Sequence, residues 1–128
     1  MKSYYVRLSK MLLVQLLMLI LISCQQKGIW KKKAEMPTAR LGLTSAVVDN
    51  KFYVIGGYAR ANAEGLATNE EYSPLKDAWI TKASMPTNRR WMSASEVDGK
   101  IYIFGGYKNF GLPGLPTVEA YDPKSDSW

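Results

Sequence analysis

The chain of 128 residues contains no histidine and only one cysteine, Cys24. Without histidine it cannot form the Ser-His-Asp or Cys-His arrangements of hydrolases, nor a metal site with imidazole ligands. A single cysteine cannot form an internal disulfide or a thiolate cluster for zinc or iron–sulfur. These absences exclude most common routes to catalysis. We therefore predict a small non-enzymatic protein that uses no metal and no cofactor.

Positive charge is concentrated at the N-terminal end of the chain, whose formal net charge is +6. Residues 1–33 carry seven basic and no acidic side chains, whereas residues 34–128 carry ten basic and eleven acidic ones. A nucleic-acid-binding domain is expected to cluster lysine and arginine on its folded surface. The only cluster here is Lys31-Lys32-Lys33, which suits a solvated segment near anionic lipid headgroups. We expect no nucleic acid among the partners.

The first 23 residues have the architecture of a secretory signal peptide. Residues 1–10 are basic, and residues 11–22 form an apolar run interrupted only by Gln15. A basic start followed by an apolar core of this length is typical of export signals. The run is shorter than the ~20 residues that span a bilayer, which disfavours a permanent transmembrane helix. We predict a signal helix over residues 1–23.

The residues Leu21-Ile22-Ser23-Cys24 resemble the lipobox of bacterial lipoproteins. The resemblance implies that the Cys24 thiol receives a diacylglyceryl group, that residues 24–29 form a tether, and that the protein is held at the cell envelope. Acyl chains anchor a protein with ~0.8 kcal/mol per buried methylene. Gln25 replaces the aspartate that retains lipoproteins in the inner membrane, which favours the outer membrane. The alternatives are an ordinary cleavage site beside a chance cysteine and an uncleaved anchor helix, and both also export the chain.

Residues 30–128 contain two copies of one sequence repeat. Tryptophan recurs at an interval of 49 residues, at Trp30, Trp79 and Trp128. Superposing residues 31–79 on 80–128 without a gap gives 21 identities in 49 positions. A fixed period of this size is the signature of a repeat architecture.

Each copy predicts four short strands and no helix. Turn residues Asp49-Asn50 and Asp98-Gly99 separate stretches rich in aromatic and β-branched residues, and no 3.6-residue period is sustained. A glycine pair ends the second strand of each copy, where the backbone can bend sharply. The expected strands are 43–49, 51–55, 68–72 and one beginning at 77–80 in the first copy, and 92–98, 100–104 and 117–121 in the second. Four antiparallel strands per repeat correspond to a propeller blade.

The repeat resembles the kelch family in its paired glycines, the tyrosine about fifteen residues later, the tryptophan seven residues further on, and a Met-Pro-Thr-x-x-Arg lead-in. The resemblance implies an all-β fold of kelch-type β-propeller blades. Blade 1 with a preceding outer strand would occupy residues 30–79, and blade 2 would occupy residues 80–128 with its last strand truncated. Propellers close with ~4–8 blades. We therefore expect the front of a longer, six-bladed propeller, with self-assembly of about three copies as the alternative.

Residues repeated at the same phase are expected to be structural. Each blade has an apolar face that only a neighbouring blade can cover, and aromatic residues bury large areas there. Arg40 and Arg89 are expected to form a salt bridge or to contact backbone carbonyls. The glycine pairs lack the Gly-x-Gly-x-x-Gly pattern and the following helix of a phosphate loop. The predicted structural residues are Trp30, Gly56, Gly57, Tyr72, Trp79, Gly105, Gly106, Tyr121 and Trp128.

Function is expected where the two copies differ, which is the connection into the first strand and the loop after the glycine pair. In peptide-binding kelch propellers, residues matching Gly42, Trp91, Tyr58 and Tyr107 line the ligand-facing mouth. Arginine and tryptophan together have the composition of binding hot spots. The candidate binding residues are Tyr58, Arg90, Trp91, Tyr107 and Phe110. Packing of Trp91 beneath its own loop is the alternative to ligand contact.

We therefore expect an exported, lipid-anchored, non-catalytic module that binds a protein or glycan at the bacterial cell envelope. The alternative is a fragment of a sugar-processing kelch propeller similar to sialic-acid mutarotase. In that case Glu96, Arg40 and Arg89 would supply acid–base chemistry and carboxylate binding. Glu96 replaces Val47 of the first copy, and a solvated position suits this carboxylate better than a buried one.

Overall fold

The computed structural model describes residues 28–59 and 64–128. The predicted signal helix and the lipidation site Cys24 lie outside the described residues. Residues 33–128 form one compact unit, and residues 28–32 belong to a separate one. The described ranges contain strands and no helix, which confirms the all-β prediction. No helix within these ranges has the length and apolar character needed to cross a membrane.

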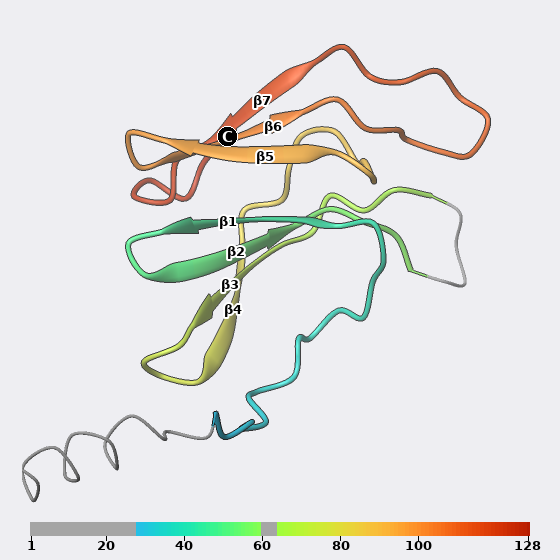
Figure 1. Ribbon diagram of the computed structural model, residues 1–128. Helices are drawn as coiled ribbons and strands as arrows, with labels where there is room; N and C mark the ends of the chain where they lie inside the picture. The colour runs from blue at the N-terminus through green and yellow to red at the C-terminus, as the bar shows by residue number, and fades with distance from the viewer. Residues whose placement is uncertain (1–27, 60–63) are drawn as a thin grey trace, which may run out of the picture. The chain divides into compact units, whose positions relative to one another are not determined.

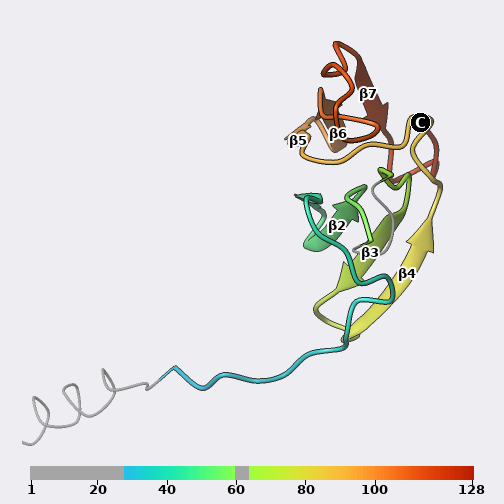
Figure 2. The same ribbon diagram turned by 90° about the vertical axis from the view of Figure 1, so that its right-hand side faces the viewer.

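The unit is built from two antiparallel sheets, one above the other (Figure 1). The first sheet, blade 1, has the order β1-β2-β3-β4, with β1 (Thr44–Val48), β2 (Lys51–Ile55), β3 (Asn69–Ser73) and β4 (Ala78–Lys82). The second sheet, blade 2, has the order β5-β6-β7, with β5 (Ser93–Val97), β6 (Lys100–Phe104) and β7 (Val118–Tyr121). Figure 2 shows the same stacking from the side. The predicted strands are thus found, and no strand end is shifted by more than one residue. The first strand of each copy is one residue shorter at both ends than predicted.

The turns that connect these strands follow from the residues at their tips. Asp49 and Asn50 join β1 to β2, and Asp98 and Gly99 join β5 to β6; all four have positive φ. Such two-residue turns match the twist of antiparallel strands. Glu96 is exposed, as predicted, and its carboxylate accepts a hydrogen bond from the Gly99 N–H at 2.7 Å. The side chain therefore supports the second of these turns.

The hydrophobic core lies between the two blades. Strand side chains alternate between faces, so Ile101 and Ile103 of β6 point toward blade 1 and are fully buried. Tyr53 and Ile55 of β2 belong to the same cluster from the other side. Full burial of one aliphatic side chain contributes about 1.5–3 kcal/mol. The core cluster comprises Val48, Tyr53, Ile55, Met85, Met92, Ile101, Ile103 and Tyr121.

The outer strand expected at Trp30 is not found, because residues 28–40 contain no strand. Trp30 lies in residues 28–32, which belong to the separate unit, so its expected packing between blades stays a prediction. A segment becomes a stable strand only when it pairs with a neighbour. The residues of the first copy that align with this segment form β4, which pairs with β3.

Candidate functional site

Two buried ion pairs recur at the same position of each blade. Arg40 lies 3.0 Å from Glu70, and Arg89 lies 2.9 Å from Glu119. The Arg40 guanidinium also donates to the Val54 carbonyl, which confirms the predicted salt bridges and carbonyl contacts. The partner glutamates were missed by the sequence analysis. Their identity at equivalent positions of the two copies is the signal that could have revealed them.

The last turn of each blade holds the chain segment that precedes the blade. The Asp126 carboxylate accepts hydrogen bonds from the Ala83 N–H and the Tyr121 hydroxyl, and the Trp128 indole N–H donates to the Ala83 carbonyl. In blade 1 the Asp77 carboxylate likewise accepts hydrogen bonds from the Ala34 N–H and the Tyr72 hydroxyl, and the Trp79 indole N–H donates to the Ala34 carbonyl. Each tryptophan also packs on its tyrosine, with ring centroids 5.0–5.1 Å apart. These contacts give structural roles to four of the predicted repeat residues, Tyr72, Trp79, Tyr121 and Trp128.

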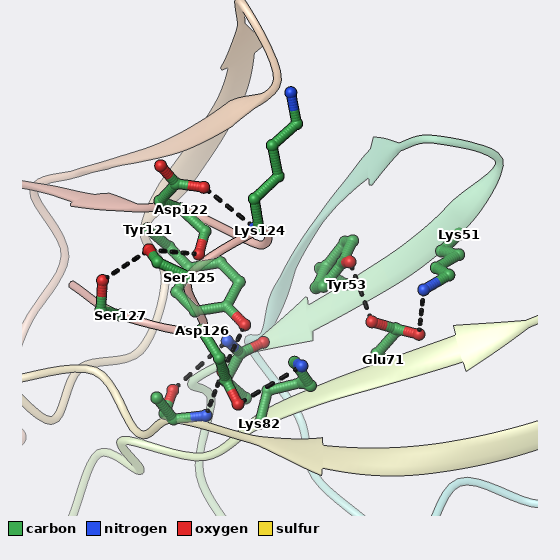
Figure 3. Close-up of polar contacts among 12 residues, drawn as sticks. Lys51, Tyr53, Glu71, Lys82, Tyr121, Asp122, Lys124, Ser125, Asp126 and Ser127 are labelled. Carbon is green, nitrogen blue, oxygen red and sulfur yellow. Dashed lines mark hydrogen bonds and ion pairs between the residues drawn. The ribbon is translucent and has the colours of Figure 1, made fainter.

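The polar network around these turns shifts several pKa values (Figure 3). The hydrogen bond from Tyr121, together with that from the Ala83 N–H, lowers the pKa of Asp126. Burial, followed by the hydrogen bond to Asp126, raises the pKa of Tyr121. Burial opposes ionisation of Glu71, but hydrogen bonds from Lys51 and Tyr53 prevail and lower its pKa. The carboxylates are therefore held ionised and the tyrosines neutral, which suits fixed hydrogen bonds and not proton transfer.

The predicted binding residues come together at one end of the blades, where strands give way to loops. We call Tyr58, Arg90, Trp91, Tyr107 and Phe110 the loop-rim cluster. The Trp91 ring meets Tyr58, Tyr107 and Phe110 edge to face, with ring centroids 5.8, 6.3 and 5.4 Å apart. Tyr58 comes from blade 1 and the others from blade 2, so the cluster forms only because the blades stack.

The backbone at the base of the loop-rim cluster positions these rings. Tyr58 follows the glycine pair after β2 and bridges to Leu41, and Tyr107 follows the pair after β6 and bridges to Arg90. The Trp91 N–H donates to the Gly42 carbonyl at 2.8 Å, which joins the two blades directly. The glycine pairs thus end the second strands, as predicted, and bring each following tyrosine to the rim.

Trp91 has an unusual backbone conformation. Its φ is +52°, and the equivalent residue of the first copy, Gly42, has φ +58°. This left-handed region suits glycine and costs other residues roughly 1–2 kcal/mol. A Cβ on Gly42 would lie 2.6 Å from Cδ1 of Trp91, so glycine also leaves the space that the indole occupies. At this position of the repeat, the first copy thus has an unstrained glycine and the second copy has a strained tryptophan.

Arg90 lies beneath these rings and not on the exposed rim where it was expected. It is fully buried, and its guanidinium carbon lies 4.9, 4.9 and 4.3 Å from the ring centroids of Tyr58, Trp91 and Phe110. Trp91, Tyr107 and Phe110 are each at least 40% exposed. The cluster thus presents an open aromatic surface with a cation underneath. Among residues 28–59 and 64–128, no group of histidine, cysteine or carboxylate side chains could hold a metal.

Comparison with known proteins identifies the repeat. The family model described as the Kelch motif matches residues 39–86 and 89–128. The solved structure of YjhT superposes with a TM-score of 0.71 and 20% sequence identity, covering 81% of this chain and 41% of that one. The chain thus spans about two fifths of the length of YjhT. None of the curated proteins matches the chain.

Proposed function

The chain belongs to the kelch-repeat family, and we propose that it is a non-catalytic binding module whose loop-rim cluster holds a protein or glycan. The observation that carries this proposal is Trp91, a tryptophan in the left-handed region where the other copy has glycine. Residues held in strained backbone conformations cluster at functional sites. The exposed rings around it supply the aromatic surface typical of binding hot spots.

The contacts that Glu96, Arg40 and Arg89 make within the protein favour a binding function over the sugar-processing alternative. That alternative needs Glu96, Arg40 and Arg89 for acid–base chemistry. Glu96 supports a turn, and the two arginines are paired with Glu70 and Glu119. The loop-rim cluster, in contrast, presents exposed rings of Trp91, Tyr107 and Phe110 to a ligand.

Replacing Trp91 with glycine tests the proposed site. We expect the fold to persist, because glycine adopts this backbone conformation without strain, and ligand affinity to fall about thirtyfold or more, as for a central hot-spot residue. Binding of the full chain to arrays of envelope glycans and surface proteins measures the effect, with circular dichroism as the check on folding. Leu75→Ala is the control, because Leu75 is an exposed apolar residue outside the cluster. Binding that is unchanged by Trp91→Gly would refute the proposal.

We further propose that the module is exported and anchored by lipid on Cys24 in the bacterial cell envelope, at the outer membrane or on the periplasmic side. Support comes from the basic start, the apolar run and the Leu-Ile-Ser-Cys sequence of the leader. The intact mass of the protein isolated from bacterial membranes is expected to correspond to a chain that begins at an acylated Cys24. An unmodified thiol on Cys24, or a chain that keeps Met1, would contradict the anchor.

A further inference from the structure

Arg89 and Arg90 are adjacent and equally buried, but they differ in the hydrogen-bond partners of their guanidinium groups. The Arg89 guanidinium pairs with Glu119 and also donates to Thr117 and to the Gly105 carbonyl. The Nε and both Nη atoms of Arg90 are buried and have no hydrogen-bond partner among residues 28–59 and 64–128. Burial of an unpaired cation is strongly unfavourable, and the neighbouring rings offset only part of that penalty. Arg90 is thus a buried guanidinium that lacks an anion.

The repeat itself does not require this arginine. Leu41 occupies the equivalent position in the first copy, where it makes the same backbone bridge to the tyrosine that follows the glycine pair. On the loop next to Phe110, the Oδ1 atom of Asn109 is also buried and has no hydrogen-bond partner within the described ranges. The second copy therefore has unused donors on Arg90, in the loop-rim cluster, and an unused acceptor on Asn109, the residue before Phe110.

We propose that Arg90 is the anion-binding group of the loop-rim cluster and that the ligand presents a carboxylate to it. The inference rests on the proposed binding function and names the chemistry of the ligand. The planar guanidinium fork matches a carboxylate with two parallel hydrogen bonds. A monoanion balances the single charge of Arg90 and loses less hydration among apolar rings than a phosphate dianion does.

The route to Arg90 passes the Phe110 ring. Phe110 is 67% exposed, the most of the three rings that contact the guanidinium, and it lies in the loop between β6 and β7. A ligand that displaces this ring reaches the Arg90 nitrogens while it keeps contact with Trp91. Its carboxylate would accept hydrogen bonds from Arg90, and a neighbouring hydroxyl or N–H of the ligand would satisfy Asn109.

Paired probes that differ only in charge test the proposal. Phenylacetate and phenylacetamide have the same size and the same aromatic ring. The ratio of their affinities for the full chain therefore measures what the carboxylate contributes to binding. We expect the parent protein to bind phenylacetate at least tenfold more tightly, as charge-assisted hydrogen bonds predict. Arg90→Met is expected to abolish the preference, and Arg90→Lys to retain a smaller one, because lysine keeps the charge but not the planar fork. Lys124→Met, which removes an exposed charge from the turn after β7, should behave as the parent.

The outcomes separate this inference from the binding function. Equal affinity for the two probes in the parent, a preference that survives Arg90→Met, or tighter binding of phenyl phosphate would each overturn the carboxylate assignment. If Trp91→Gly still abolishes ligand binding in those cases, the binding function stands without it. Glucuronate and N-acetylaspartate methylamide, each compared with its neutral amide, form two further arms. An Arg90-dependent preference in either arm supports the proposal, and the arm with tighter binding identifies the source as a saccharide or a polypeptide.

Discussion

Replacing Arg89 with methionine is expected to lower the free energy of unfolding by about 3–5 kcal/mol, the usual penalty for removing one partner of a buried ion pair. The change leaves the largely buried Glu119 carboxylate without its cation, and it removes the donors that satisfy Thr117 and the Gly105 carbonyl. Urea denaturation of the variant beside the parent measures the loss. Arg40→Met should give a loss of similar size, since Arg40 pairs with Glu70 in the same way.

Arg90→Met is the matched control for this experiment. Arg90 is as buried as Arg89 but has no hydrogen-bond partner in the part of the chain that the structure describes, and methionine retains contact with the surrounding rings. Because Arg90→Met removes a buried unpaired charge, we expect the free energy of unfolding to stay unchanged or to rise. Equal losses from the two substitutions would show that burial, and not pairing, determines what each arginine contributes.

Gly56→Ala is expected to destabilise the protein by about 2–5 kcal/mol, because two penalties add at this position. Gly56 has φ +62°, where a side chain is strained, and an added Cβ would lie 2.6 Å from the Arg89 carbonyl oxygen of the next blade. A backbone atom of a packed neighbour cannot move aside cheaply. Thermal or urea denaturation of the variant measures the combined loss.

Gly105→Ala separates the two penalties. Gly105 occupies the equivalent position in blade 2 with φ +64°, but the nearest atom to an added Cβ is the Leu115 carbonyl oxygen at 3.5 Å. Only the conformational penalty of roughly 1–2 kcal/mol remains there. If both alanine variants lose the same stability, close contact between the blades is not what requires glycine at position 56.

The strands and their repeat could be predicted from the chain because their causes are local. The aromatic and β-branched runs that follow the Asp-Asn and Asp-Gly turns predicted the bounds of β2 and β6 correctly to the residue. The matching arginines at the same phase correctly indicated ion pairs. The failure at Trp30 has a physical reason, since its segment has strand character but its conformation depends on a partner strand supplied from elsewhere in the sheet.

The candidate site was only partly predictable. Trp91 and Phe110 were selected because the two copies differ there, and Tyr58 because of the resemblance to peptide-binding kelch propellers; the three do lie together. Their shared contact with Arg90, and the burial of that arginine, depend on how blade 1 stacks on blade 2. The repeat distinguishes Arg89, which matches Arg40, from Arg90, which matches Leu41, but it does not show that Arg90 is buried.

The amino-acid sequence by itself determined the repeat, the β-strands and the kelch family, because these follow from residue period, turn chemistry and motif spacing. Only the tertiary structure decided that Arg90 is buried beneath the rings and that Trp91 is strained. Those properties arise between blades: the hydrogen bonds and ring contacts that define them join residues brought together by packing, and packing is a property of the assembled sheets.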